Sequence, residues 1–77
     1  MNHTIVHSQD DVKKHYYYKS STPPIARSFP CIMIEDDCDA GLMGNQRVYS
    51  FIYPPASATG LQKMYWMQGY IEGHKYA

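Results

Sequence analysis

Two pairs of adjacent prolines, Pro23-Pro24 and Pro54-Pro55, constrain the fold of this 77-residue chain more than any other feature. Proline has a fixed backbone angle and no amide hydrogen to donate, so neither a helix interior nor a central strand continues through such a pair. The two pairs therefore divide the chain into an N-terminal, a middle and a C-terminal segment. Because a chain of this length forms one domain at most, we expect a single small domain over residues 1–77.

The N-terminal segment predicts a short strand followed by a helix. Ile5 and Val6 favour a strand or an ordered lead-in. Ser8 is a typical helix N-cap, because its hydroxyl can accept from the free backbone amide of Asp11, three residues later. We expect the helix to run from this cap to about Lys19. The three tyrosines at positions 16–18 could equally form a strand, since aromatic side chains favour pleated surfaces.

The middle segment predicts an antiparallel β-hairpin with a long loop. Residues 29–35 are rich in Ile and Met, residues 36–46 have turn composition, and residues 47–53 show the clearest strand pattern. Alternation divides the second strand into an aromatic face and an aliphatic face: Tyr49, Phe51 and Tyr53 on one, Val48 and Ile52 on the other. Because a two-stranded sheet is marginal on its own, a homodimer formed through the sheet is a possible outcome.

The C-terminal segment predicts a helix that opens with a capping box. Thr59 is followed three residues later by Gln62, so the two side chains can bond reciprocally to each other's backbone amides. At about 100° per residue, one arc of this helix faces the core and a second lies near the surface. We assign Met64, Met67, Ile71 and Trp66 to the core, and Tyr65 and Tyr70 to the surface.

The predicted fold class is therefore α+β, with an N-terminal helix, an antiparallel hairpin and a C-terminal helix packed on the sheet. Eight tyrosines and one tryptophan give such a small chain more aromatic surface than its own core can bury. Tyrosine combines a large apolar ring with a hydroxyl that tolerates water, which suits interfaces. The sequence therefore favours a stoichiometric protein-binding module. Inhibitors or modulators of a larger bacterial complex fit this description, including anti-restriction and anti-CRISPR proteins of phages and mobile elements.

The candidate partner-binding residues are an acidic run in the predicted loop and two tyrosines of the predicted C-terminal helix. Asp36, Asp37 and Asp39 would accelerate the encounter with a basic partner surface, and Tyr65 and Tyr70 would act as anchors that slow its release. The competing interpretation of the acidic run is a solvated hairpin loop, since runs of charge usually face water.

Nucleic-acid binding is the alternative function. Tyr49, Phe51 and Tyr53 could stack on bases, with Arg47 nearby and Lys13, Lys14 or Lys19 on phosphates. However, seven basic and seven acidic side chains cancel, and nucleic-acid binders usually carry a basic excess. The charge balance therefore argues for core packing of these aromatic residues.

No motif indicates a cofactor, a metal or catalysis. His3 and His7, and likewise Asp11 and His15, have helical spacing, but a zinc site needs three or four converging ligands. Cys31 and Cys38 lack the spacing of a thiolate pair, and no nucleophile signature accompanies them. We therefore expect neither an enzyme nor a cofactor-binding protein.

The predicted location is the cytoplasm. Residues 1–4 lack the charged start of a signal peptide, and no apolar run approaches the length of a membrane span. Two cysteines are too few for the disulfide framework of a small secreted domain, so we expect reduced thiols.

Overall fold

The computed structural model describes residues 2–39 and 44–75 of the chain. Its elements follow in the order β1 (Asn2–Val6), α1 (Gln9–His15), β2 (Cys31–Asp39), β3 (Asn45–Ile52) and α2 (Gly60–Lys75). The strands form one antiparallel sheet in the order β1-β2-β3. The predicted α+β class is confirmed, and the predicted hairpin corresponds to β2 and β3.

The third strand removes one argument for a dimer. The short strand expected at Ile5 and Val6 extends back to Asn2 and pairs with β2 along its whole length. Because three strands with a hydrophobic face are more stable than an isolated hairpin, the sheet no longer needs a second copy of the chain for this reason.

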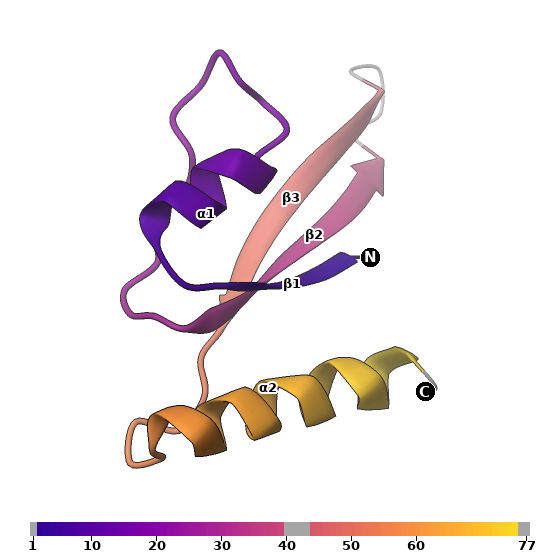
Figure 1. Cartoon of the computed structure of the whole chain (residues 1–77). Helices are drawn as coiled ribbons and strands as arrows, with labels where there is room; N and C mark the ends of the chain where they lie inside the picture. Colours follow the sequence, from indigo (N-terminus) through magenta and orange to yellow (C-terminus); the bar gives the residue numbers. More distant parts are fainter. Residues whose placement is uncertain (1, 40–43, 76–77) are drawn as a thin grey trace.

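The sheet separates two layers, with α1 on one side and α2 on the other (Figure 1). Paired residues of neighbouring strands project to the same face, and successive residues alternate between faces. Val6 pairs with Cys31, and Met33 pairs with Phe51, so these residues define what we call the α1 face. The opposite face, which we call the α2 face, carries His3, Ile5, Ile32, Ile34 and Ile52.

The main core lies on the α1 face. Val12 of α1 is fully buried there together with Val6, Cys31 and Met33. Half-buried aromatic side chains pack around this cluster: Phe29, Tyr49, Phe51 and Tyr53. The predicted alternation of β3 is therefore confirmed, and its aromatic face is the one that points into the core.

Helix α1 begins as predicted but ends early. The Ser8 hydroxyl accepts a hydrogen bond from the Asp11 amide at 3.3 Å, which confirms the N-cap. The Asp11 carboxylate in turn accepts from the His7 amide at 2.9 Å. The helix ends at His15 instead of Lys19, and the Lys19 ammonium group donates to two carbonyls of the last turn.

Tertiary contacts of the tyrosine run explain the early end. The Tyr16 ring lies 4.9 Å from the Tyr49 ring of β3, between centroids. The Tyr17 amide donates to the Tyr49 hydroxyl at 2.9 Å, and the Tyr18 hydroxyl accepts from the Arg47 amide. These contacts hold the three tyrosines against β3 in a conformation that continued helix would not allow.

The acidic run lies in a strand and not in the predicted turn. The predicted strand at residues 29–35 corresponds to β2, which begins two residues later and extends to Asp39. Asp36 pairs with Val48, and Asp37 pairs with Arg47. The opposite charge of Arg47 across the ladder stabilises strand pairing at a place where composition alone indicates a turn. The residues of the expected turn at positions 40–43 lie outside the described part of the chain.

Helix α2 opens with the predicted capping box. The Thr59 hydroxyl accepts from the Gln62 amide at 3.2 Å, and the Gln62 side chain accepts from the Thr59 amide at 2.9 Å. Met67 is fully buried, and Met64 and Ile71 are half-buried, as predicted. These buried residues and the ring contacts described below are observed. Packing of the whole helix on the sheet remains a prediction.

Trp66 is a correction to the predicted core. Its side chain is 37% exposed, whereas Tyr65 is 65% exposed, as predicted for a surface residue. Trp66 lies about 100° around the helix from Met67, so it falls at the flank of the buried stripe. There its ring stacks on the Tyr70 ring at 5.5 Å, and Tyr70 is half-buried.

Candidate functional site

A cleft of about 320 Å³ separates the C-terminal half of α2 from the α2 face of the sheet. Two aliphatic side chains, Ile34 of β2 and Val48 of β3, lie in the cleft, and Val48 is 45% exposed. The full lining comprises His3, Ile34, Asp36, Val48, Tyr49, Ser50, Tyr70 and His74. Three strands and one helix therefore contribute to the same cleft.

A row of stacked rings runs along α2, and two of its members, Tyr70 and His74, line the cleft. Trp66, Tyr70 and His74 recur every four residues, so they lie above one another on one side of the helix. The Tyr70 and His74 rings are 4.3 Å apart between centroids, and the Trp66 ring stacks on the other side of Tyr70. Nδ1 of His74 lies 2.9 Å from the Tyr70 carbonyl oxygen, which fixes the orientation of the imidazole.

His3 joins this row to the sheet. Its ring lies 5.3 Å from the His74 ring and 6.2 Å from the Tyr70 ring. Nε2 of His3 is buried and has no hydrogen-bond partner among the described residues. Burial, the neighbouring His74 and the positive N-terminus together lower the pKa of His3 below its ordinary value. The neutral form of His3 is therefore favoured in the folded protein.

Folding stability should consequently fall when the pH drops below neutrality. In the unfolded chain His3 has its ordinary pKa and binds a proton more readily than in the folded chain. The contribution of neutral His3 to the free energy of unfolding is therefore present above pH 6.5 and is lost as the pH falls through the lowered pKa. We expect His3→Phe, which keeps an aromatic ring, to reduce the loss of Tm between pH 7.5 and pH 5. The exposed His7 is the matched control, because His7→Phe should leave the wild-type pH profile unchanged. Parallel profiles for wild type and His3→Phe would contradict this assignment.

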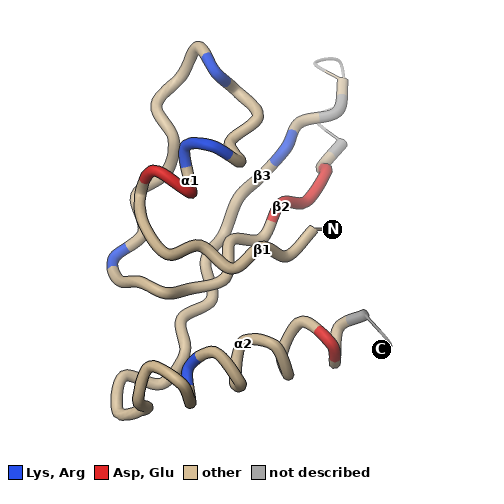
Figure 2. The backbone as a smooth tube through the Cα atoms, in the orientation of Figure 1, with Lys and Arg blue, Asp and Glu red and all other residues tan. Residues whose placement is uncertain are grey.

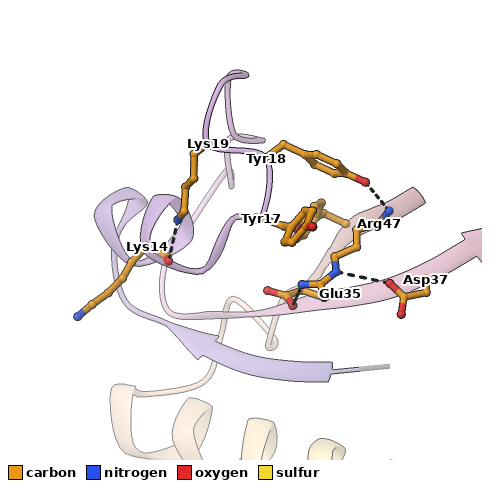
Figure 3. A network of polar contacts seen from close by, with 8 residues as sticks. Lys14, Tyr17, Tyr18, Lys19, Glu35, Asp37 and Arg47 are labelled. Atoms are coloured by element: carbon orange, nitrogen blue, oxygen red, sulfur yellow. Dashed lines mark hydrogen bonds and ion pairs between the residues drawn. The ribbon is translucent and has the colours of Figure 1, made fainter. Parts of the chain in front are cut away.

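Asp37, the residue after Asp36 on β2, lies on the α1 face and not in the cleft. Figure 3 shows the Arg47 guanidinium between Glu35 and Asp37, at 4.0 and 3.5 Å from their carboxylate oxygens. The guanidinium also lies 4.3 Å from the centroid of the Tyr17 ring. A hollow of about 250 Å³ opens here, lined by Tyr17, Tyr18, Asp37 and Arg47. Its opposite charges neutralise each other within the fold.

The predicted partner-binding residues therefore do not form one patch. Asp36 and Tyr70 meet in the cleft, whereas Asp37 projects from the other face of β2 beside Arg47. Tyr65 lies on the outward side of α2, and the side chain of Asp39 is outside the described part of the structure. Figure 2 shows the acidic stretch of β2 beside the basic position on β3.

Sequence reasoning missed five residues of the cleft: His3, Ile34, Val48, Ser50 and His74. The four-residue spacing of Trp66, Tyr70 and His74 was a usable signal for the ring row. No local signal pairs His3 with His74, because these residues are brought together only by the addition of β1 to the sheet.

The aromatic face proposed for bases is occupied within the fold. Tyr49, Phe51 and Tyr53 pack against the core, and the Tyr53 hydroxyl accepts from the Arg27 amide at 3.1 Å. The Arg27 guanidinium lies 4.0 Å from the Tyr53 ring centroid. These contacts favour a packing role for the three rings over a base-stacking platform.

The cysteines and other ionisable side chains add no second site to the described structure. Cys31 and Cys38 are seven residues apart on β2, a separation of about 23 Å along a strand, so they do not bridge each other. Burial raises the pKa of the Cys31 thiol, which disfavours the reactive thiolate. Among the His, Cys, Asp and Glu side chains that the structure describes, no three converge as metal ligands. Within residues 2–39 and 44–75, neither helix combines the length and apolar character needed to cross a membrane.

Comparison of the chain with protein-family models, with curated proteins and with solved structures finds no significant match.

Proposed function

We propose that this protein is a small binding module that holds one protein partner against the outward side of α2. The observation that carries the proposal is the exposure of large apolar side chains on this helix. Leu61 is 66% exposed and Tyr65 is 65% exposed, and the two lie one turn apart with Trp66 beside them. Adjacent exposed apolar residues of this size are typical of interaction surfaces.

The composition of this side of α2 supports a protein partner. Gln62, Gly69 and Gly73 are exposed there, and a Cβ atom added to either glycine would meet no other atom within 4 Å. Glu72 is the one acidic residue of α2, so this surface is weakly charged and aromatic, as the centres of protein interfaces usually are. Nucleic acid would require a basic surface, and α2 between residues 60 and 74 carries one lysine.

The partner we propose is a larger bacterial complex, and the module would act on it in the cytoplasm as an inhibitor or modulator. Support for the cytoplasmic location comes from the separation of the two cysteines along one strand, which fits reduced thiols. Identification of the protein that co-purifies with the tagged chain tests this part of the proposal.

The direct test is affinity capture from a bacterial lysate with wild-type and variant proteins. Replacing Tyr65 by Ala should weaken binding of the captured partner at least about 10-fold, because buried aromatic anchors dominate interface energies. The Tm should change by no more than about 3 °C, since the side chain is mostly in solvent.

Tyr17→Ala is the matched control. Tyr17 is another tyrosine with a 58% exposed side chain, but it lies on the α1 side of the molecule. The proposal requires that this variant retain the partner. Equal retention by both variants, or capture of nucleic acid in place of protein, would refute it.

A further inference from the structure

Asp36 is the acidic side chain of the cleft, and it is half-buried beside Val48. Among the side chains that the structure describes, no Lys, Arg or His forms an ion pair with it. Its neighbours Glu35 and Asp37 both lie within 4.0 Å of the Arg47 guanidinium on the other face. The α2 face of β2 thus presents a carboxylate that the described fold does not neutralise.

The other lining residues can contact the uncharged stem of a long cationic side chain. Ile34 and Val48 offer aliphatic surface to a methylene stem, and Tyr70 lines the same cleft with an aromatic ring. Lysine and arginine carry such a stem with a charge at its end. A volume of about 320 Å³ is at the lower end for ligand pockets, which suits one side chain better than a large ligand.

We infer that the cleft receives a single lysine or arginine side chain of the partner, with its charge at Asp36. The inference rests on the proposed function and assigns a chemistry to one contact of that interface. The ring row connects the proposed interface to the cleft, because Trp66 lies at the flank of the exposed side of α2 and stacks on Tyr70 in the cleft. A partner that covers Tyr65 and Trp66 therefore lies next to Tyr70, from which one of its side chains can reach into the cleft.

The test is an NMR titration of the wild-type protein with three small probes at pH 7.5. The probes are the N-acetyl methylamides of arginine, of lysine and of citrulline, which resembles arginine in shape but carries no charge. Arginine or lysine should shift the amides of Ile34, Asp36, Val48 and Ser50 in a saturable way. Citrulline should bind at least about fivefold more weakly, because it cannot pair with the carboxylate.

Two variants separate the cleft from general electrostatics. Asp36→Asn should abolish saturable binding of the charged probes, whereas Asp37→Asn, the adjacent acid on the other face, should leave it within about twofold. Equal binding of citrulline and arginine, or unchanged binding by Asp36→Asn, would overturn the inference.

The two proposals fail separately. Loss of the partner on Tyr65→Ala without any probe binding overturns the cationic contact and leaves the proposed function standing. A wild-type protein that captures no partner overturns the function, whatever the probes do.

Discussion

Replacing Met67 by Asp is expected to lower the free energy of unfolding by at least about 3 kcal/mol and the Tm by more than about 10 °C. Met67 is fully buried on the inward stripe of α2, so the new carboxylate must either lose its hydration or expel the helix from its position. Thermal unfolding followed by circular dichroism measures the effect. The same change should remove the cleft, because Tyr70 and His74 reach the sheet from the same helix.

Gln68→Asp provides the control at the next position of α2. Gln68 is exposed, so this substitution adds the same charge to the same helix at a cost within about 0.5 kcal/mol. Wild-type stability of Met67→Asp would contradict the burial of Met67 and, with it, the position of α2 beside the sheet.

The second large effect is expected on the α1 face. Met33 is fully buried between Thr4 of β1 and Phe51 of β3, in the cluster that also contains Val12 of α1. Truncation to Ala should cost about 2–5 kcal/mol, from lost apolar burial and the cavity left behind. In a domain of this size, such a loss is a large part of the total stability.

Urea unfolding of Met33→Ala and Val48→Ala compares a buried with a partly exposed position of the same sheet. Val48 is 45% exposed, so its truncation should cost less than about 1 kcal/mol. Similar losses for the two variants would show that the core is not centred on the α1 face.

Local chemistry accounts for the features that the sequence predicted correctly. The proline pairs delimit the segments, and both helix starts depend on bonds between residues three apart, at Ser8 and at Thr59. The alternation of β3 is likewise a property of consecutive residues. Such signals depend on residues of one segment, so they do not change with the packing of the rest of the chain.

The errors arise where distant residues decide the outcome. Helix α1 ends early because Tyr17 and Tyr18 bond to residues of β3 about 30 positions away. The acidic run becomes strand because Arg47 lies across from Asp37. Strand geometry then places Asp36 and Asp37 on opposite faces, which a loop would not have required.

The candidate site could be predicted only in part for the same reason. Asp36 and Tyr70 were both identified, but their meeting in one cleft depends on how α2 lies beside the sheet. His3 and His74 come from opposite ends of the chain, and no periodicity links them.

Hydrogen–deuterium exchange of the protein, free and in complex with its captured partner, tests most directly where the partner binds. We predict slower exchange in the complex at residues 65–74 of α2 and at residues 34–36 and 48–50 around the cleft. Protection confined to the tyrosine run at residues 16–18 and to Arg47, with α2 exchanging as in the free protein, would contradict binding at this surface.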